Sequence, residues 1–173
     1  MNPPTSPPQA SAGPARLPKF TFSKPEPVRI ERVLIPTDFS NHALDALNQG
    51  RSLALEFGAR LTVLHVFETI NLAYETVSAQ MVECAQRAED DARALLADIH
   101  EQLKAAPGPE VDAVFAIGRP SEKIVEVATN LKQDLIVIST HGYTGLKHLF
   151  LGSVAERVLR HATCPVYVHR ARL

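Results

Sequence analysis

The sequence predicts an α/β domain in which a five-stranded parallel sheet, in the spatial order 3-2-1-4-5, carries helices on both faces. From Arg29 onward, short apolar runs alternate with longer segments whose apolar residues recur every three or four positions. Residues 134–139, DLIVIS, are also almost continuously apolar, which is typical of a strand covered on both sides. This βαβαβαβαβ order favours parallel strands joined by helices.

The first strand is expected at residues 32–37, RVLIPT, a short apolar run with a proline near its end. A helix follows, with Ser40 as the expected N-cap and Gly58 as the residue just past its end. Its apolar face is formed by Ala43, Ala46, Leu47, Gly50, Leu53, Ala54 and Phe57. Residues 60–68, RLTVLHVFE, are the second expected strand.

A longer helix is expected next, ending at the APGPE segment of residues 106–110 because proline stops a helix. Its apolar positions keep a spacing of three to four and are Val77, Met81, Cys84, Ala88, Ala92, Leu95, Ile99 and Leu103. Residues 111–118, VDAVFAIG, form the third expected strand.

Pro120 is expected to start the third helix, in the first turn where proline is tolerated. The apolar face of that helix comprises Ile124, Ala128 and Leu131. The fourth strand is expected at 134–139, a helix at about 153–161 and the last strand at 164–170.

The composition limits the classes of function. A net charge of −1 with scattered basic residues gives no indication of a nucleic-acid surface, and no apolar stretch approaches the roughly 20 residues that span a bilayer. Cys84 and Cys164 form no CxxC pair, so neither a zinc site nor a disulfide framework is expected. We expect a reducing, cytoplasmic setting instead. The histidines form no HExxH arrangement, so no metal site is expected.

The N-terminus differs from the rest of the chain. Residues 1–28 are rich in proline and are expected to form a disordered extension, whereas residues 29–173 form one domain. The prolines interrupt any apolar core of a secretory signal.

The connection after residues 134–139 is the most informative segment. More than ten residues precede the helix at Ser153, whereas such connections usually take about 2–6 residues. Gly142 and Gly145 allow backbone amides to approach a ligand, and the first amides of a helix that follows Gly152 attract anions. The segment therefore predicts a phosphate site, to which Lys147 and His148 could add positive charge.

Two structural alternatives remain open at this point. SVAE at residues 153–156 is a capping box, in which Ser153 and Glu156 satisfy the helix amides without any ligand. Asp38 follows the first strand at the same edge of the sheet, where it either contacts a ribose hydroxyl or adenine amino group or supports the start of the next helix.

Four segments together resemble the universal stress protein (UspA) family, in its ATP-binding branch. They are LIPTDFS at 34–40, LTVLHV at 61–66, GRPSEKI at 118–124 and the long run of residues 139–170. That branch carries a G-x2-G-x9-G-(S/T) loop, which Gly142, nine residues, Gly152 and Ser153 match, while Ser139 stands where the pattern has its first glycine. The resemblance implies an adenine nucleotide alpha hydrolase-like fold and ATP accompanied by Mg²⁺ or Mn²⁺.

The resemblance also implies roles for individual residues. Pro36, Thr37 and Asp38 would line the adenine and ribose side, and Val66 would contact adenine through its backbone. Ile138 and Ser139 would lie under the ribose, and the phosphates would contact Gly142, Gly152, Ser153 and Val154, with His141 a further candidate in the same loop. A homodimer is implied through the last strand, at Pro165, Val166, Tyr167 and Val168, the alternating valines giving that strand an apolar face that could pack on the partner.

Other protein families with the same alternation of strands and helices are excluded because motifs that they require are absent. The third strand ends in FAIG without the acidic phosphoacceptor of a receiver domain, and PTDFSNHA lacks the glycines of an adenylating enzyme's first loop. No Walker A motif occurs. Three hypotheses remain: a nucleotide-binding regulatory module, which is favoured; an enzyme with at most weak ATP hydrolysis; and a nucleotide-free stress dimer that acts through protein contacts.

Overall fold

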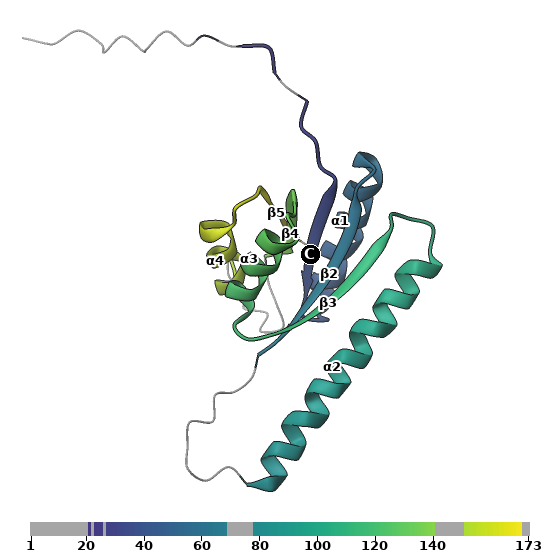
Figure 1. Ribbon diagram of the computed structural model, residues 1–173, viewed down its shortest axis with the longest axis vertical. Coiled ribbons are helices and arrows are strands. Elements are labelled where there is room, and N and C mark those ends of the chain that lie inside the picture. The colour runs from purple at the N-terminus through teal and green to yellow at the C-terminus, as the bar shows by residue number, and fades with distance from the viewer. Residues whose placement is uncertain (1–20, 22, 26, 69–77, 141–150, 171–173) are drawn as a thin grey trace, which may run out of the picture.

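A computed structural model of the chain describes residues 21, 23–25, 27–68, 78–140 and 151–170. Its sheet has five parallel strands in the order β3-β2-β1-β4-β5, so the predicted fold class and strand order are confirmed (Figure 1). The strands are β1 (Arg32–Thr37), β2 (Arg60–Phe67), β3 (Val111–Ile117), β4 (Leu135–Ser139) and β5 (Val166–His169). The helices are α1 (Asn41–Phe57), α2 (Ala79–Ala105), α3 (Pro120–Asn130) and α4 (Ser153–His161). The predicted N-terminal extension lies almost entirely outside the described residues.

The helices cover the sheet in two pairs, with α3 and α4 on one side and α1 and α2 on the other (Figure 1). Side chains of β1 alternate between the two faces, because successive residues of a strand point in opposite directions. Val33 and Ile35 pack with α1 and α2, whereas Leu34 packs with α3 and α4. The sheet is therefore a central layer with a core on each side.

Local signals in the sequence placed several helix ends correctly. The Ser40 side chain caps α1 by accepting a hydrogen bond from the amide of Ala43, and Gly58 ends that helix at a φ of 65°. Pro120 begins α3 as predicted. β1 has the predicted bounds, and the other strands differ from theirs by one or two residues. Asp134, for example, precedes β4, and its carboxylate accepts hydrogen bonds from the amides of Glu31 and Arg32.

The capping-box alternative for the start of α4 is wrong. Gly152 is the N-cap, its carbonyl oxygen accepting a hydrogen bond from the amide of Glu156 at 2.9 Å, so that Ser153 is already inside the helix. No side chain caps this end. Glu156 instead pairs with Arg160, one turn further on, at 2.8 Å.

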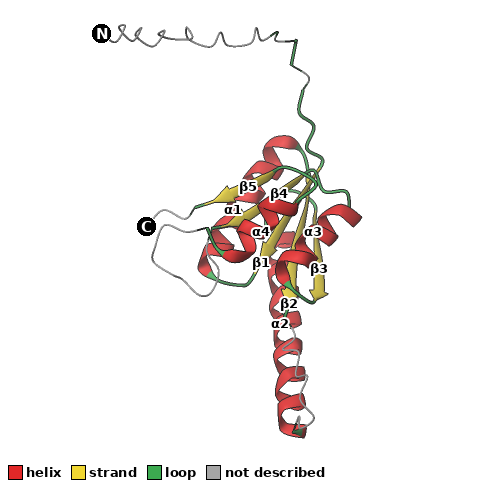
Figure 2. Ribbon diagram, turned by 90° about the vertical axis from the view of Figure 1, so that its left-hand side faces the viewer, coloured by secondary structure: helices red, strands yellow, loops and turns green. Residues whose placement is uncertain are grey.

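The first half of α2 projects past the end of the sheet (Figures 1 and 2). Its buried residues are Ala92, Leu96 and Leu103, of which the apolar spacing predicted Ala92 and Leu103 but not Leu96. Four predicted core positions are exposed instead, namely Met81, Cys84, Ala88 and Leu95. The helix is longer than the strands beneath it, and spacing alone does not show where the sheet ends.

Two other predicted core residues are also exposed, each at a helix end. Phe57 is 45% exposed at the end of α1 and Leu131 is 42% exposed just after α3. None of the helices described is long and apolar enough to cross a membrane.

Candidate functional site

A cavity of about 360 Å³ opens at the carboxyl ends of β1, β2 and β4. The strand order reverses between β1 and β4, and in open α/β sheets such a position is where ligands bind. Its lining comes from the ends of these three strands and from the first turns of α1, α3 and α4. The lining residues are Pro36, Thr37, Asp38, Ala43, Leu64, Val66, Glu68, Pro120, Ile124, Ile138, Ser139, Thr140, Gly152, Ser153, Val154 and Ala155. We call it the β1–β4 cavity.

The inner wall of the β1–β4 cavity is apolar. Leu64 of β2, Ile124 of α3 and Ile138 of β4 are buried and belong to the core between the sheet and the helices α3 and α4. Val66, half-buried at the end of β2, packs against the same core. An apolar wall with polar groups at its rim suits a flat, partly apolar ligand such as a nucleobase.

The turn between β1 and α1 forms one rim of the cavity. Oδ1 of Asp38 accepts hydrogen bonds from the amide and the hydroxyl of Ser40, at 3.1 and 2.6 Å. The hydroxyl of Thr37 accepts a third, from the amide of Phe39, at 3.0 Å. Asp38 thus supports the start of α1, as one of its two predicted alternatives states, and it also lines the cavity.

Behind this turn lies a buried histidine. Nδ1 of His65 lies 2.9 Å from the carbonyl oxygen of Thr37, which can only accept, so this nitrogen carries the hydrogen. Its ring stacks on Phe39 and contacts Phe115. Burial lowers the pKa of His65, against smaller raising effects of the Thr37 carbonyl and the Asp38 carboxylate. His65 was not predicted from the sequence, since none of its neighbours in the chain indicates these contacts.

The start of α4 forms the opposite rim. The amide of Gly152 donates a hydrogen bond to the carbonyl oxygen of Thr140 at 2.8 Å, which ties this helix start to the end of β4. Gly152 offers no side chain to the first amides of α4, and no side-chain cap is formed. Uncapped amides at a helix start carry partial positive charge and attract anions.

The structure brings together nine of the predicted site residues around this one cavity. They are Pro36, Thr37, Asp38, Val66, Ile138, Ser139, Gly152, Ser153 and Val154. His141 and Gly142 lie outside the described residues, as do Gly145, Lys147 and His148. Glu68, Pro120, Ile124 and Thr140 were not predicted; Pro120 and Ile124 come from α3, which reaches the cavity only because it crosses over the sheet.

The apolar face of the last strand lies against its own domain. Val166 and Val168 are partly buried against the core between the sheet and the helices α3 and α4. Tyr167 is 41% exposed. Across the described ranges, no three His, Cys, Asp or Glu side chains converge as metal ligands.

Comparisons with known proteins agree on one family. The model of the universal stress protein family matches residues 29–170. A universal stress protein from Thermus aquaticus is 33% identical over 143 residues, which cover 80% of this chain and 97% of the relative. The structure of UspA from Lactobacillus plantarum superposes with a TM-score of 0.71 at 26% identity, covering 82% of this chain and 99% of that one.

Two more distant structures share the fold and were solved with nucleotides. One is a universal stress protein in complex with cAMP, with a TM-score of 0.60 and 22% identity over 81% of this chain and 97% of its own. The other, from Archaeoglobus fulgidus, is in complex with dAMP, with a TM-score of 0.55 and 19% identity over 82% of this chain and 98% of its own. The five-stranded sheet is thus the adenine nucleotide alpha hydrolase-like sheet of these neighbours.

Proposed function

The chain belongs to the universal stress protein family, and on that premise we propose that it binds an adenine nucleotide in the β1–β4 cavity and acts as a regulatory module. The observation that carries this proposal is the convergence of an apolar wall, a carboxylate rim and an uncapped helix start on one cavity. Each of these three features suits a different part of a nucleotide.

The base lies against the apolar wall, where Leu64 and Ile124 exclude water. The ribose lies near Ser139 and Asp38, because a carboxylate accepts hydrogen bonds from hydroxyl groups and repels phosphate. The phosphates lie at Gly152, Ser153 and Val154, where the helix start offers amides to an anion. Family members solved with cAMP and dAMP support an adenine nucleotide as the ligand class.

The form of the ligand that we propose is ATP with Mg²⁺ or Mn²⁺. The donor groups around Gly152 are backbone amides, which bind phosphate oxygens and not cations. The cation is therefore held by the phosphates and water, as Mg²⁺ usually is at nucleotide sites.

We further propose that two copies associate through β5, the edge strand of the sheet. An uncovered edge offers backbone groups for pairing across a two-fold axis. Cys84 and Cys164 are free cysteines, which suits a reducing compartment, and we place the protein in the cytoplasm.

The test begins with freshly purified protein to which no nucleotide has been added. The protein is denatured, and any released small molecule is identified by chromatography and mass spectrometry. Adenine nucleotide near one per chain supports the proposal. A protein that releases none and gives no calorimetric signal with AMP, ADP or Mg-ATP overturns it.

A further inference from the structure

A second hollow of about 360 Å³ adjoins the β1–β4 cavity where α3 and α4 begin. The two share Glu68, Pro120, Ser153 and Val154, so a ligand at the start of α4 borders both. Beyond these residues the hollow is lined by Arg119, Ser121 and Arg157. We call it the arginine hollow.

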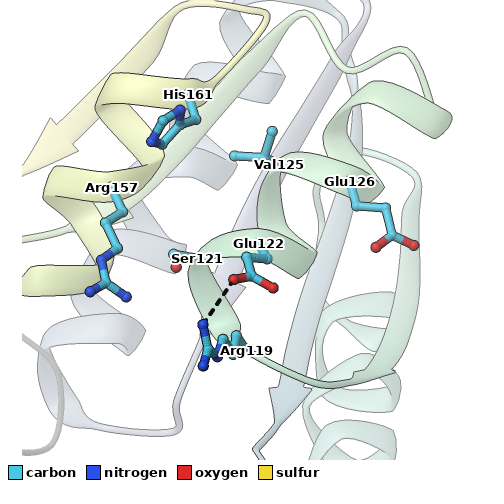
Figure 3. Close-up of a pocket in the computed structure, with 7 residues that line it drawn as sticks. All are labelled: Arg119, Ser121, Glu122, Val125, Glu126, Arg157 and His161. Carbon is cyan, nitrogen blue, oxygen red and sulfur yellow. Dashed lines mark hydrogen bonds and ion pairs between the residues drawn. The ribbon is translucent and has the colours of Figure 1, made fainter.

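The arginine hollow continues into a groove of about 570 Å³ between α3 and α4 (Figure 3). Figure 3 shows Arg157 on α4 and Arg119 before α3, with both guanidinium groups at the same end of this groove. His161 lies at its other end. The N-cap of α3 and the helix α4 thus each present one guanidinium group to the same space.

Neither arginine is strongly engaged within the protein. Arg119 pairs with Glu122 at 3.4 Å, with both side chains about two-thirds exposed or more, and such a pair contributes little. Arg157 makes no hydrogen bond or ion pair with any residue that the structure describes. The two arginines and Glu68 give the lining of the hollow a formal charge of +1.

Ser121 is the observation that most directly indicates a ligand. The residue is only 9% exposed, yet none of the described groups forms a hydrogen bond with its hydroxyl. It lines both the arginine hollow and the groove, and Figure 3 shows it between the two arginines. Ser121 therefore lines the hollow from an otherwise buried position, and its hydroxyl can donate a hydrogen bond to a ligand there.

Both helix starts at this hollow favour the same kind of ligand. Arg119 is the N-cap of α3 and Gly152 that of α4, and neither helix has a side-chain cap. The positive ends of two helix dipoles therefore add to the two guanidinium groups. Guanidinium, hydroxyl and helix amides together are donors suited to a phosphate.

We propose that Arg119, Ser121 and Arg157 bind the terminal phosphate of a nucleoside triphosphate whose adenosine part occupies the β1–β4 cavity. This inference rests on the proposed function and adds a selectivity to it: the chain binds ATP more tightly than AMP. Glu68 borders the same space and weakens the site by repulsion.

The test compares the affinities of the full chain for AMP and ATP, measured by calorimetry with Mg²⁺ present. Wild-type protein is expected to bind ATP at least about tenfold more tightly than AMP, since each charged hydrogen bond is worth roughly tenfold. Arg157→Gln, Arg119→Gln and Ser121→Ala should each lower the affinity for ATP and leave that for AMP unchanged. Arg160→Gln is the matched control, because Arg160 lies on the same helix and already pairs with Glu156.

Each further result decides between the two proposals. If wild type binds neither nucleotide, the proposed function fails. If it binds AMP but ATP no more tightly, or if Arg157→Gln weakens both equally, this inference fails and the proposed function stands. In another outcome, inorganic phosphate binds together with AMP, and the arginine variants abolish the binding of phosphate alone. In that case the arginine hollow binds a free anion, and the inference is overturned.

Discussion

The ring of Phe39 stacks on the ring of His65, with the ring centroids 4.2 Å apart and the planes inclined by 23°. Phe39 adopts a φ of 64°, a left-handed conformation that costs a bulky residue about 1–2 kcal/mol. The stack and the hydrogen bond that the Phe39 amide donates to Thr37 Oγ1 offset that cost. The turn between β1 and α1, which borders the β1–β4 cavity, is thus stabilised by contacts with the buried His65.

We predict that acid weakens the protein through His65. Burial lowers the pKa of His65 in the folded chain below its ordinary value of 6.5, so the unfolded chain binds the proton more readily. The free energy of unfolding should therefore fall as the pH drops from about 6.5 toward the lowered pKa, and should not change from this source above 6.5. Urea unfolding at a series of pH values between 8 and 5 measures this change in the free energy of unfolding.

His65→Asn separates this effect from the titration of other groups. Asparagine keeps a donor for the Thr37 carbonyl and does not titrate, so the loss of stability below pH 6.5 should be smaller in this variant. Substitution of His161, an exposed residue of α4, is the control. An unchanged pH dependence in His65→Asn would contradict the prediction.

Gly50 provides a prediction about packing. It lies on the buried face of α1, and a Cβ built there would collide with the side chain of Ile35, whose Cγ1 lies at 3.0 Å. Gly50→Ala gains about 1 kcal/mol of helix propensity but overpacks a completely buried residue, which costs roughly 1–3 kcal/mol. We expect a net loss in the free energy of unfolding of about 1 kcal/mol, measured by urea unfolding.

A second substitution tests the cause of that loss. Ile35→Val removes the end of the side chain that a Cβ at Gly50 would meet. The double variant should therefore be less destabilised than the sum of the two single variants. Simple additivity would show that the cost of Gly50→Ala comes from elsewhere.

The fold was predictable where a local signal decides the structure. Gly58 ends α1 and Pro120 begins α3 because each has a backbone preference that acts without tertiary contacts. Leu95 and Leu96 show the limit, since the spacing favoured Leu95 and the sheet buries Leu96. Which of two neighbours faces the core depends on how the helix is rotated over the strands.

The candidate site was predictable to a similar degree. Asp38 and Gly152 follow from the rule that ligands bind where the strand order reverses. The contact of Phe39 with His65 and the arrival of Ile124 at the cavity do not, because both join residues distant in sequence. The capping-box alternative required Ser153 to be the N-cap, whereas the N-cap is Gly152, one residue earlier. The sequence SVAE is compatible with either helix start.

Cys164 should be a slowly reacting thiol. Burial raises its pKa, and the Asp134 carboxylate raises the pKa further, so little of the reactive thiolate forms near neutral pH. Cys84 is exposed and should be alkylated first. Timed treatment with iodoacetamide, followed by peptide mass spectrometry, measures both rates. Faster labelling of Cys164 would argue for a reactive role in place of packing.

The edge strand gives a test of the proposed dimer. The carbonyl oxygens of Pro165 and His169 accept hydrogen bonds from the amides of Ile136 and Thr140. Because backbone groups alternate in direction along a strand, those of Val168 point to the open edge. Val168→Pro removes an outward donor without breaking the pairing with β4. We expect a monomer that remains folded, seen by sedimentation velocity and circular dichroism.

Val168→Ala is the control for the lost side chain, since alanine keeps the backbone donor. It should remain dimeric at concentrations where Val168→Pro is monomeric. A proline variant that sediments as a dimer would place the interface elsewhere.

Gly152 tests the nucleotide site most directly. Its φ of −58° and ψ of 148° form an extended conformation that a β-branched residue adopts readily, and its amide hydrogen bond to Thr140 does not involve a side chain. Gly152→Val should therefore leave circular dichroism and the unfolding midpoint nearly unchanged. It adds a branched side chain where the phosphates are proposed to approach the start of α4, so calorimetry should show the affinity for Mg-ATP reduced by at least about a hundredfold, more than the loss of one charged hydrogen bond. If Gly152→Val stays folded and binds ATP as wild type does, the phosphates contact another part of the chain.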